Sequence, residues 1–519
     1  MIILVNPVQR YKPARLDAPK KRHILYCLFL LLLCTVCPRM IYAQGADSVV
    51  VERYFASIKT KESLLRQFFA EMPKGGDLHN HFSGAVYAES YFKYAVGDRL
   101  CVDMKTGKLL PSSAVGNVQK LNPNMSNLHE TRMGLIDRWS IRNFNPCKDT
   151  LGPDEHFFRT FGLFGIAASR HKVEMLKELR ERAAKENVQY LEIMLVPPGI
   201  SKYTINKACN PNFYDIYNDS LKTIIRGDSV LRAERLDSIL ARIYHRWDSL
   251  QGMQQLIDKY IASTDSIDRK SFISVGTPNP PICRYQGYAS RNSDPLTVYA
   301  QLYVSFKACQ RPNSKLVGVN IVSAENKETA LEDYSAHMRM FHYLDSVTGD
   351  TIKTSLHAGE LAPGLVEPET LRDHIRQAVL VAGADRIGHG VDVASEEGSI
   401  ALLDTMRQKQ VAVEINLTSN EFILGVKDDA HPFSLYRKAG VPVVISTDDP
   451  GILRTDLTQQ YVLAVLRYGL GYYEIKQLVR NSIRFSFLPA GEKQLLLNQI
   501  EMEFGLFENK WRKYIEANP

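Results

Sequence analysis

The sequence has no internal repeat and no low-complexity tract, and it holds few cysteines for its length. Eight of its 519 residues are cysteine, and three of these lie within the first 43 residues. The other five lack the short paired spacing of a thiolate zinc site, so we expect no metal bound by cysteine. They are Cys101, Cys147, Cys209, Cys283 and Cys309. An odd number leaves at least one thiol outside intramolecular disulfides, and we expect Cys101 and Cys147, which flank one insertion, to pair.

Excess charge is also missing from most of the chain. The formal net charge is +7, but residues 1–43 contain seven Lys or Arg and one Asp, which accounts for +6 and leaves about +1 for the rest. A protein that follows the phosphates of nucleic acid presents a strongly basic surface. We therefore expect no nucleic-acid partner.

A long hydrophobic run is lacking as well. The apolar run at residues 24–36 is too short for a confident membrane span. It follows the basic group Lys20-Lys21-Arg22 and precedes the small-residue site Ile41-Tyr42-Ala43, which is the order of a secretory signal. We predict export to a secreted or periplasmic location, with cleavage near Ala43 and no stable membrane anchor. An uncleaved N-terminal anchor is the alternative.

Beyond residue 72 the sequence alternates between strand-like and helical patterns. Most of the strand-like runs are continuously apolar or β-branched, as strands buried on both faces are. We expect strands at residues 77–82, 188–196, 271–275, 316–322, 351–357, 386–389, 411–417 and 441–447. Eight strands separated by helices indicate an α/β fold, a parallel (β/α)8 barrel of the TIM type.

An N-terminal extension and two long insertions surround this predicted barrel. Residues 1–43 form an extension with the signal peptide, residues 44–71 a helical extension, and residues 72–519 the barrel. Insertions at residues 98–150 and 199–260 follow the first and second strands on the side where barrel enzymes build their sites. Either insertion could form a lid or an interface. A homodimer is one option that the helical extension raises.

Four short motifs stand at the ends of strand-like runs, and together they predict a metal site. They are His79-Asn80-His81, His357-Ala358-Gly359-Glu360, Gly388-His389-Gly390 and Asp448-Asp449. Side chains alternate along a strand, so His79 and His81 point to the same side. His357 would add a third nitrogen and Asp448 an oxygen, with one position open, as in catalytic zinc centres. This set favours one Zn²⁺ per chain, with iron or cobalt as alternatives. The competing interpretation is satisfied core histidines.

Three further residues would carry proton transfer and substrate binding. Glu360 is expected near the metal as a general acid, because a carboxyl in a closed pocket keeps a raised pKa. A first-turn helix acid is its alternative. His389 would orient or deprotonate the attacking water, and its flanking glycines would let the backbone approach closely. Asp449 would accept a hydrogen bond from substrate, although Asp-Asp-Pro-Gly is also an ordinary turn.

These motifs, with Met72-Pro73-Lys74 and Arg386-Ile387 before Gly388, closely resemble the adenosine deaminase family of metal-dependent amidohydrolases over about residues 72–490. The exported N-terminus and first insertion look like the secreted, growth-factor-type branch. The resemblance implies that His79, His81, His357 and Asp448 bind zinc. It also implies the roles of the remaining motif residues: Glu360 protonates the purine ring, His389 partners the attacking water, and Asp449 faces the five-membered ring.

The sequence departs from the family pattern at two positions. Ser83 stands where the family commonly has an Asp that touches the ribose, and it would bind a hydroxyl more weakly. Ser323 stands where the family usually has a Gly whose backbone contacts the ring, and its N–H could serve equally well. Trp139 in the first insertion could stack on substrate, with core packing as the alternative.

The resulting functional hypothesis is zinc-dependent hydrolytic deamination of adenosine or 2′-deoxyadenosine to the inosine product and ammonia. The expected partner is therefore a small-molecule purine nucleoside. Another 6-aminopurine, such as AMP, an N6-modified purine or adenine, remains an alternative, as does a non-catalytic extracellular binding protein. We do not expect a nucleic-acid base deaminase, because the His-x-Glu and Pro-Cys-x-x-Cys motifs of that class are absent from the sequence.

Overall fold

Eight parallel strands form the central sheet of the computed structural model, which describes residues 45–227, 232–272 and 280–518. In sheet order they are β1 (Gly75–His81), β5 (Val188–Leu195), β6 (Ile282–Ser290), β7 (Leu316–Val322), β8 (Lys353–Ala358), β9 (Arg386–His389), β10 (Ala412–Ile415) and β11 (Val443–Ile445). A parallel bridge between Asn80 and Asp448 joins the first strand to the segment after the last. The predicted (β/α)8 barrel is confirmed.

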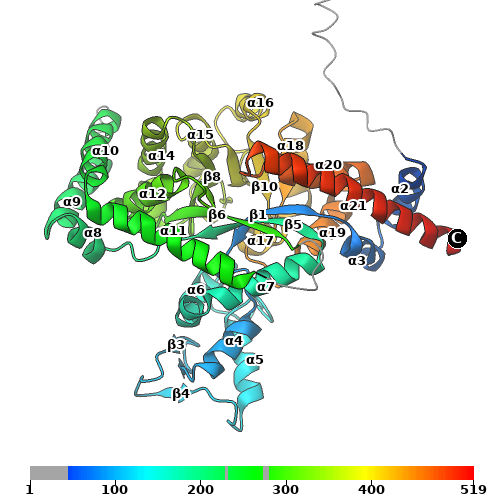
Figure 1. Cartoon of the computed structure of the whole chain (residues 1–519), viewed down its shortest axis with the longest axis horizontal. Helices are drawn as coiled ribbons and strands as arrows, with labels where there is room; N and C mark the ends of the chain where they lie inside the picture. The colour runs from blue at the N-terminus through cyan, green and yellow to red at the C-terminus, as the bar shows by residue number, and fades with distance from the viewer. Residues whose placement is uncertain (1–44, 228–231, 273–279, 519) are drawn as a thin grey trace, which may run out of the picture. The chain divides into compact units, whose positions relative to one another are not determined.

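Helices surround the strands, as Figure 1 shows. The barrel helices are α7 (Lys172–Lys185), α11 (Gln251–Ser271), α12 (Pro295–Cys309), α13 (Glu328–Glu332), α14 (Tyr334–Thr348), α15 (His374–Leu380), α16 (Ser399–Lys409), α17 (Leu417–Leu424), α18 (Phe433–Ala439), α19 (Leu457–Tyr468), α20 (Tyr472–Arg484) and α21 (Ala490–Ala517). Short 3-10 helices lie at Pro368–Arg372 and Asp428–Ala430. Local sequence sets several ends: Asp456 accepts a hydrogen bond from Gln459 N at the start of α19, and Gly349 ends α14 with φ 77°.

The expected strand at residues 271–275 is wrong. Ser271 ends α11, residues 273–279 lie outside the described ranges, and the third barrel strand is β6. Its sequence ICRYQGYAS mixes polar and apolar residues, so a search for continuous apolar runs passes over it. Gln286 of β6 is nonetheless fully buried, because it joins a polar network inside the barrel.

The first insertion is a small separate layer. A three-stranded antiparallel sheet contains β3 (Leu109–Leu110), β2 (Cys101–Asp103) and β4 (Val118–Lys120), and it is followed by α5 (Leu128–Arg138). Figure 1 shows β3, β4 and α5 beside α4 (Ala88–Gly97) and near α6 (Pro153–Arg170), apart from the barrel strands. Cys101 is buried, Cys147 is exposed, and neither forms a disulfide. The predicted pairing of Cys101 with Cys147 is therefore wrong: Cys101 faces the interior of this layer, with its Sγ 3.8 Å from the Ser112 carbonyl oxygen.

The second insertion is helical and packs on the outer helices. It contains α8 (Lys202–Ala208), α9 (Phe213–Ile225) and α10 (Arg232–Asp248), and α10 packs against α14. Two helices, α2 (Ala46–Ile58) and α3 (Glu62–Glu71), precede β1, and α3 packs against α19. No helix within the described ranges has both the length and the hydropathy to cross a bilayer. The predicted signal peptide and its cleavage site near Ala43 lie outside the described residues.

Candidate metal centre

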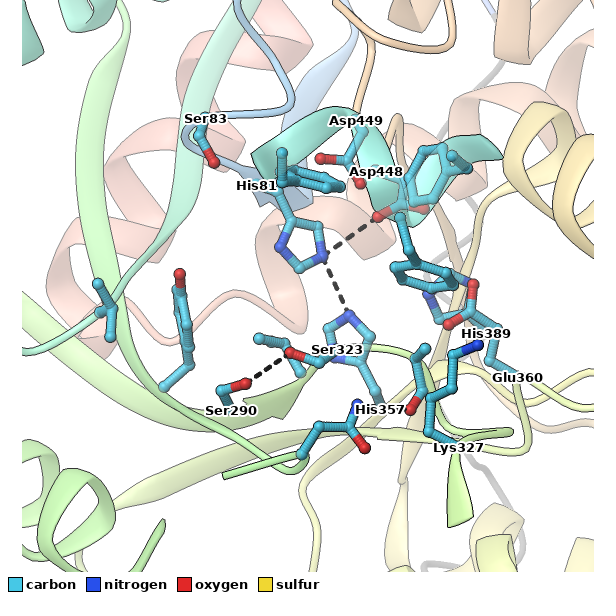
Figure 2. Close-up of a pocket in the computed structure, with 18 of the residues that line it drawn as sticks. His81, Ser83, Ser290, Ser323, Lys327, His357, Glu360, His389, Asp448 and Asp449 are labelled. Atoms are coloured by element: carbon cyan, nitrogen blue, oxygen red, sulfur yellow. Dashed lines mark hydrogen bonds and ion pairs between the residues drawn. The ribbon is translucent and has the colours of Figure 1, made fainter. Parts of the chain in front are cut away.

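The four predicted ligands meet where the strands end. His79 and His81 come from β1, His357 from β8, and Asp448 follows β11. One ligand atom from each lies within 4.8 Å of the others. Oδ1 of Asp448 is 3.2 Å from Nε2 of His79 and 3.3 Å from Nε2 of His81. Nε2 of His81 is 3.1 Å from Nε2 of His357, and Figure 2 marks the two contacts of His81 with dashed lines. The fold thus brings together residues that lie up to about 370 positions apart.

Hydrogen-bond acceptors behind two of the rings leave their Nε2 lone pairs free. Oε2 of Glu414 is 2.6 Å from Nδ1 of His79, and Oδ1 of Asn320 is 3.0 Å from Nδ1 of His357. Each acceptor holds the ring proton on Nδ1, which is the tautomer that a metal-ligating histidine requires. Nε2 of His79 is buried and makes no hydrogen bond of good geometry. An orphaned buried nitrogen is costly unless a ligand takes its lone pair, so the donor set fits a divalent cation.

The electrostatics of the cluster also favour positive charge. Burial lowers the pKa of His81 and of His357. Burial alone would lower the pKa of His79 too, but the carboxylates of Asp448 and Glu414 on either side of its ring raise it to about 10, so a cation that binds Nε2 displaces a proton from it. Burial would raise the pKa of Asp448, yet the neighbouring histidines hold it well below its usual range. The carboxylates therefore stay ionised and attract a cation to this point.

A buried ion-pair network supports Glu414 from inside the barrel. Arg386 of β9 pairs with Glu414 of β10 and with Glu192 of β5, and all three side chains are at most 1% exposed. Ser355 Oγ donates a further hydrogen bond to Glu414 at 2.7 Å. Burial would raise the pKa of Glu414, but Arg386 and these hydrogen bonds lower it to about 2. Glu414 is thus a carboxylate, the form that accepts the proton of His79 Nδ1.

The backbone turns sharply at the same edge of the barrel. Ser323 after β7, Gly359 after β8, His389 at the end of β9 and Asp448 after β11 have φ values of 86°, 71°, 67° and 65°. Three of these residues carry a side chain in the left-handed region, which costs on the order of 1–2 kcal/mol each. Strained backbone of this kind clusters at functional sites, where the surrounding structure holds it in place.

Glu360 lies beside the cluster in an extended loop. The next helical segment begins at Pro368, so the alternative of a first-turn helix acid is wrong. Glu360 and His389 each place a ligand-type atom within 4.8 Å of one on Asp448. Burial and the charge of Asp448 raise the pKa of Glu360 well above its usual value. The side chain can therefore hold a proton near neutral pH.

A second buried carboxylate fixes the loop that carries Glu360. Oε2 of Glu325 accepts the backbone N–H of Glu360 at 2.9 Å, and Oε1 accepts that of Gly359 at 3.2 Å. Nδ1 of His374 is 2.6 Å from Glu325, and Arg291 pairs with it at 3.5 Å. Because Arg291 also donates to the carbonyl of His357 at 2.8 Å, one network positions both a predicted ligand and the predicted proton donor.

His389 packs edge-on against the ring of His79 and at a tilt against that of His357. Its ring centroid is 4.9 Å from that of His79 and 5.2 Å from that of His357. A Cβ added at Gly388 would lie 2.8 Å from Cε1 of His79, so a side chain does not fit there. The preceding glycine thus has the role expected from the sequence, which is to allow close approach.

A cavity of about 720 Å³ opens onto the cluster, and its wall includes three of the predicted substrate-binding residues. Figure 2 shows Ser83, Ser323 and Asp449 around it. Oδ1 of Asp449 is buried without a hydrogen-bond partner, and burial beside Asp448 raises the pKa of Asp449 well above its usual range. A bound donor would satisfy it. Oγ of Ser323 is 2.8 Å from Oγ of Ser290, so its hydroxyl is already engaged.

Trp139 does not line this cavity, which corrects its prediction as a substrate-binding residue. It is 1% exposed, and its indole Nε1–H donates to the carbonyl of Gly107 at 2.9 Å. Its ring also packs edge-to-face against Phe164 of α6, with the centroids 6.5 Å apart. Core packing between the first insertion and α6 accounts for this residue.

Much of the cavity wall consists of residues that no sequence motif identifies. Phe157, Phe158 and Phe161 of α6 line it, as do Tyr288 of β6 and Lys327 before α13. Spacing on α6 signals an apolar face, but it does not distinguish a cavity wall from a core. Tyr288 was missed with its strand. Glu414 had a usable signal, since it is a lone acid inside the apolar run Val411 to Ile415.

Part of this chain is similar in sequence to known proteins. Residues 300–503 match the family model for adenosine deaminase. Curated adenosine deaminases from Escherichia coli O1:K1 / APEC and Escherichia coli strain SMS-3-5 are 36% and 35% identical to it over 147 residues, which is 28% of this chain and 41% of each relative. The matched part of the chain thus spans less than half the length of these relatives.

Solved structures extend the likeness to the whole barrel. The crystal structure of the arabidopsis N6-mAMP deaminase has a TM-score of 0.53 and 18% identity, covering 84% of this chain and 99% of that one. The adenine deaminase from Arthrobacter aurescens has a TM-score of 0.50 and 16% identity, covering 83% and 98%. At these identities the likeness shows the fold alone.

Proposed function

We propose that this protein hydrolyses the exocyclic amine of a 6-aminopurine. The premise is that residues 300–503 match the family model for adenosine deaminase. The preferred substrates are adenosine and 2′-deoxyadenosine, which would be converted with water to the inosine product and ammonia. One observation carries the proposal. Asp448 belongs to two groups, one with His79, His81 and His357 and the other with Glu360 and His389, and the ligand-type atoms of each group lie within 4.8 Å of one another.

The proposed cation is Zn²⁺, held by His79, His81, His357 and Asp448. Three imidazole nitrogens and one carboxylate oxygen suit zinc, and a pocket beside them leaves room for water. When bound, a divalent cation there supplies Lewis-acid chemistry, which makes water a nucleophile near neutral pH.

The other residues would act on the purine. Protonated Glu360 gives its proton to the ring nitrogen next to C6, which makes C6 more electrophilic as water adds to it. His389 orients that water, and Asp449 accepts a hydrogen bond from the ring, for which its buried and unpartnered Oδ1 is suited. The exocyclic amine takes up one proton of the water and leaves as ammonia, the other proton of the water restores Glu360, and the water oxygen remains on C6 as the carbonyl.

The charge of the cavity wall favours a nucleoside over a nucleotide. Among the described residues that line it, Lys327 is the single Lys or Arg. A phosphate group is usually bound by several cationic or backbone donors. The similarity to deaminases of N6-mAMP and of adenine motivates those substrates as alternatives.

Side-by-side turnover decides among the substrates. Zinc-loaded protein should be assayed on adenosine, 2′-deoxyadenosine, AMP, N6-methyl-AMP and adenine, with ammonia release as the readout. We expect the two nucleosides to have the highest kcat/KM. A higher value for AMP or adenine would replace the nucleoside assignment, and no turnover on any of them would reject purine deamination.

Gly84 offers a test of Asp449. A Cβ added at Gly84 would lie 1.5 Å from Oδ1 of Asp449, so Gly84→Ala must displace that carboxyl. Overpacking costs about 1–3 kcal/mol, and we therefore expect kcat/KM to fall roughly 5- to 150-fold with zinc content unchanged. Gly134→Ala on α5, where nothing lies within 4 Å, is the control. Equal kinetics for both variants would exclude a substrate role for Asp449.

Export remains a prediction, since the signal at residues 20–43 lies outside the described residues. We propose a secreted or periplasmic enzyme that acts on external purines. The secreted growth-factor-type branch and a homodimer likewise remain proposals that rest on the sequence.

A further inference from the structure

His389 differs from His79 and His357 in the group that faces its Nδ1 atom. Acceptor oxygens of Glu414 and Asn320 face Nδ1 of His79 and His357. Nδ1 of His389 instead lies 2.9 Å from the amide nitrogen Nδ2 of Asn420 on α17. An amide NH₂ donates hydrogen bonds and does not accept them, so Nδ1 of His389 must be the acceptor.

The orientation of the Asn420 amide is fixed by a chain of donors. The backbone N–H of Phe433 donates to Nδ1 of His431 at 3.2 Å, so Nδ1 of His431 carries no proton. Nε2–H of His431 then donates to Oδ1 of Asn420 at 3.0 Å. If the Asn420 amide were reversed, His431 would face a donor at each ring nitrogen, which a neutral imidazole cannot accommodate.

The first donor of this hydrogen-bond chain, the backbone N–H of Phe433, is available because of helix geometry. Phe433 is the first residue of α18, and the first N–H groups of a helix have no intrahelical partner. The imidazole of His431 accepts one of them. The direction of every later hydrogen bond in the chain follows from this one backbone donor.

The hydrogen-bond chain from Phe433 through His431 and Asn420 to His389 is shielded from solvent. Asn420 is fully buried, and His389 and His431 are 1% and 2% exposed. Burial lowers the pKa of His431 to about 4, so its ring is neutral near pH 7, and the amide donor that faces Nδ1 of His389 keeps that nitrogen unprotonated. Oε1 of Glu360 is 3.6 Å from Nδ1 of His389, which is beyond hydrogen-bond distance. Asn420 therefore decides where the His389 proton lies.

We propose that Asn420 and His431 are positioning residues that fix His389 as the Nε2–H tautomer. His389 then presents a donor to the cavity that it lines, and it orients the attacking water by donating to it. This selects between the two roles that the sequence left open for His389, because a ring with a proton on Nε2 cannot remove a proton there.

The same tautomer separates the two overlapping groups of candidate ligands. One group contains His79, His81, His357 and Asp448, and the other contains Glu360, His389 and Asp448. A metal needs the lone pair of a neutral imidazole nitrogen. His79 and His357 offer it at Nε2, whereas His389 has Nδ1 committed to Asn420 and a proton on Nε2. A cation is thus directed to the first group.

Nuclear magnetic resonance tests the tautomer directly. Full-length protein labelled with ¹⁵N in its histidine rings would be examined near neutral pH, metal-free and zinc-loaded, by two-bond ¹H–¹⁵N correlation. Comparison with His389→Gln identifies the His389 signals. We expect a protonated, pyrrole-type Nε2 and an unprotonated, pyridine-type Nδ1. The reverse pattern in the wild-type protein would overturn the proposal.

Asn420→Asp tests the cause. A carboxylate at this position only accepts, so the proton of His389 should move to Nδ1 and the ¹⁵N pattern should invert. Asn416→Asp is the matched control at the start of α17, where the Asn416 amide is buried without a hydrogen-bond partner, and it should leave the pattern unchanged. An unchanged pattern in Asn420→Asp, or inversion in the control, would contradict the role of Asn420.

A pair of substitutions at His431 gives the kinetic test. His431→Gln keeps an N–H for Asn420, whereas His431→Leu removes it. We expect the Leu variant to lose roughly 10- to 100-fold in kcat with little change in KM, as for outer partners of other metal sites, and the Gln variant to recover most of it. Equal losses in both would indicate a merely structural role. This kinetic test rests on the proposed function, but the spectroscopic tests hold whichever substrate is turned over.

Discussion

Glu360→Gln should lower kcat by roughly 10²–10⁴-fold, the range for loss of a general acid. Gln matches Glu in size and can still donate a hydrogen bond, but it has no proton to release to a ring nitrogen. The backbone N–H of residue 360 would keep its bond to Glu325, so the loop should hold its place. Steady-state kinetics on the best purine measure the effect, and KM, zinc content and the thermal midpoint should stay close to wild type.

The control is Glu369→Gln, an exposed glutamate on the 3-10 helix that follows the same loop. It should leave kcat unchanged. A Glu360→Gln protein with near-wild-type kcat would exclude Glu360 as the proton donor. If the variant lost turnover but kept a biological effect of the protein, the non-catalytic binding role would gain support.

Asp448→Asn should release the metal and abolish turnover together. Asn keeps the shape of Asp and tolerates the left-handed backbone at this position, where φ is 65°. It removes the anion that lies 3.2 Å from His79 and 3.3 Å from His81, so the cation loses its one charged ligand. Loss of an outer partner already costs 10–100-fold in metal affinity, and loss of a ligand should cost at least roughly 10²-fold. Zinc per chain after dialysis is the measurement.

Asp449→Asn is the matched control for this variant, since it makes the same change one residue later. It should keep about one zinc per chain and change only the kinetics of substrate. Zinc retained in Asp448→Asn, or lost equally from both variants, would contradict the assignment of Asp448 as the ligand.

The functional residues at the ends of the strands could be predicted from the sequence, because each motif is a short local pattern. A His-x-His pair on a strand and a glycine-flanked histidine have few alternative uses, and the fold brings His79 and His357 together as expected. The barrel itself followed from buried strands such as β5 and β7, whose residues are mostly apolar.

Apart from Glu414, a lone acid inside an apolar run, the residues that support the ligands could not be predicted, because the support depends on contacts between distant strands. Glu414, Arg386 and Glu192 come from three strands, and no local pattern reveals that they pair inside the barrel. The strand β6 was missed for the same reason, since its polar Gln286 is satisfied only in the assembled interior. Asn420 and His431 sit in apparently ordinary segments, and their relation to His389 depends on how α17 and α18 pack.

The left-handed backbone at Ser323, His389 and Asp448 bears on any attempt to select heat-tolerant variants. Glycine adopts that backbone without a Cβ clash, so each exchange would relieve on the order of 1 kcal/mol. At residues 389 and 448 the exchange deletes a side chain of the site, whereas at residue 323 the backbone N–H survives it. Selection for thermal tolerance alone would therefore favour loss of the side chains of residues 389 and 448. Among these three positions, selection for both properties would tolerate glycine at residue 323.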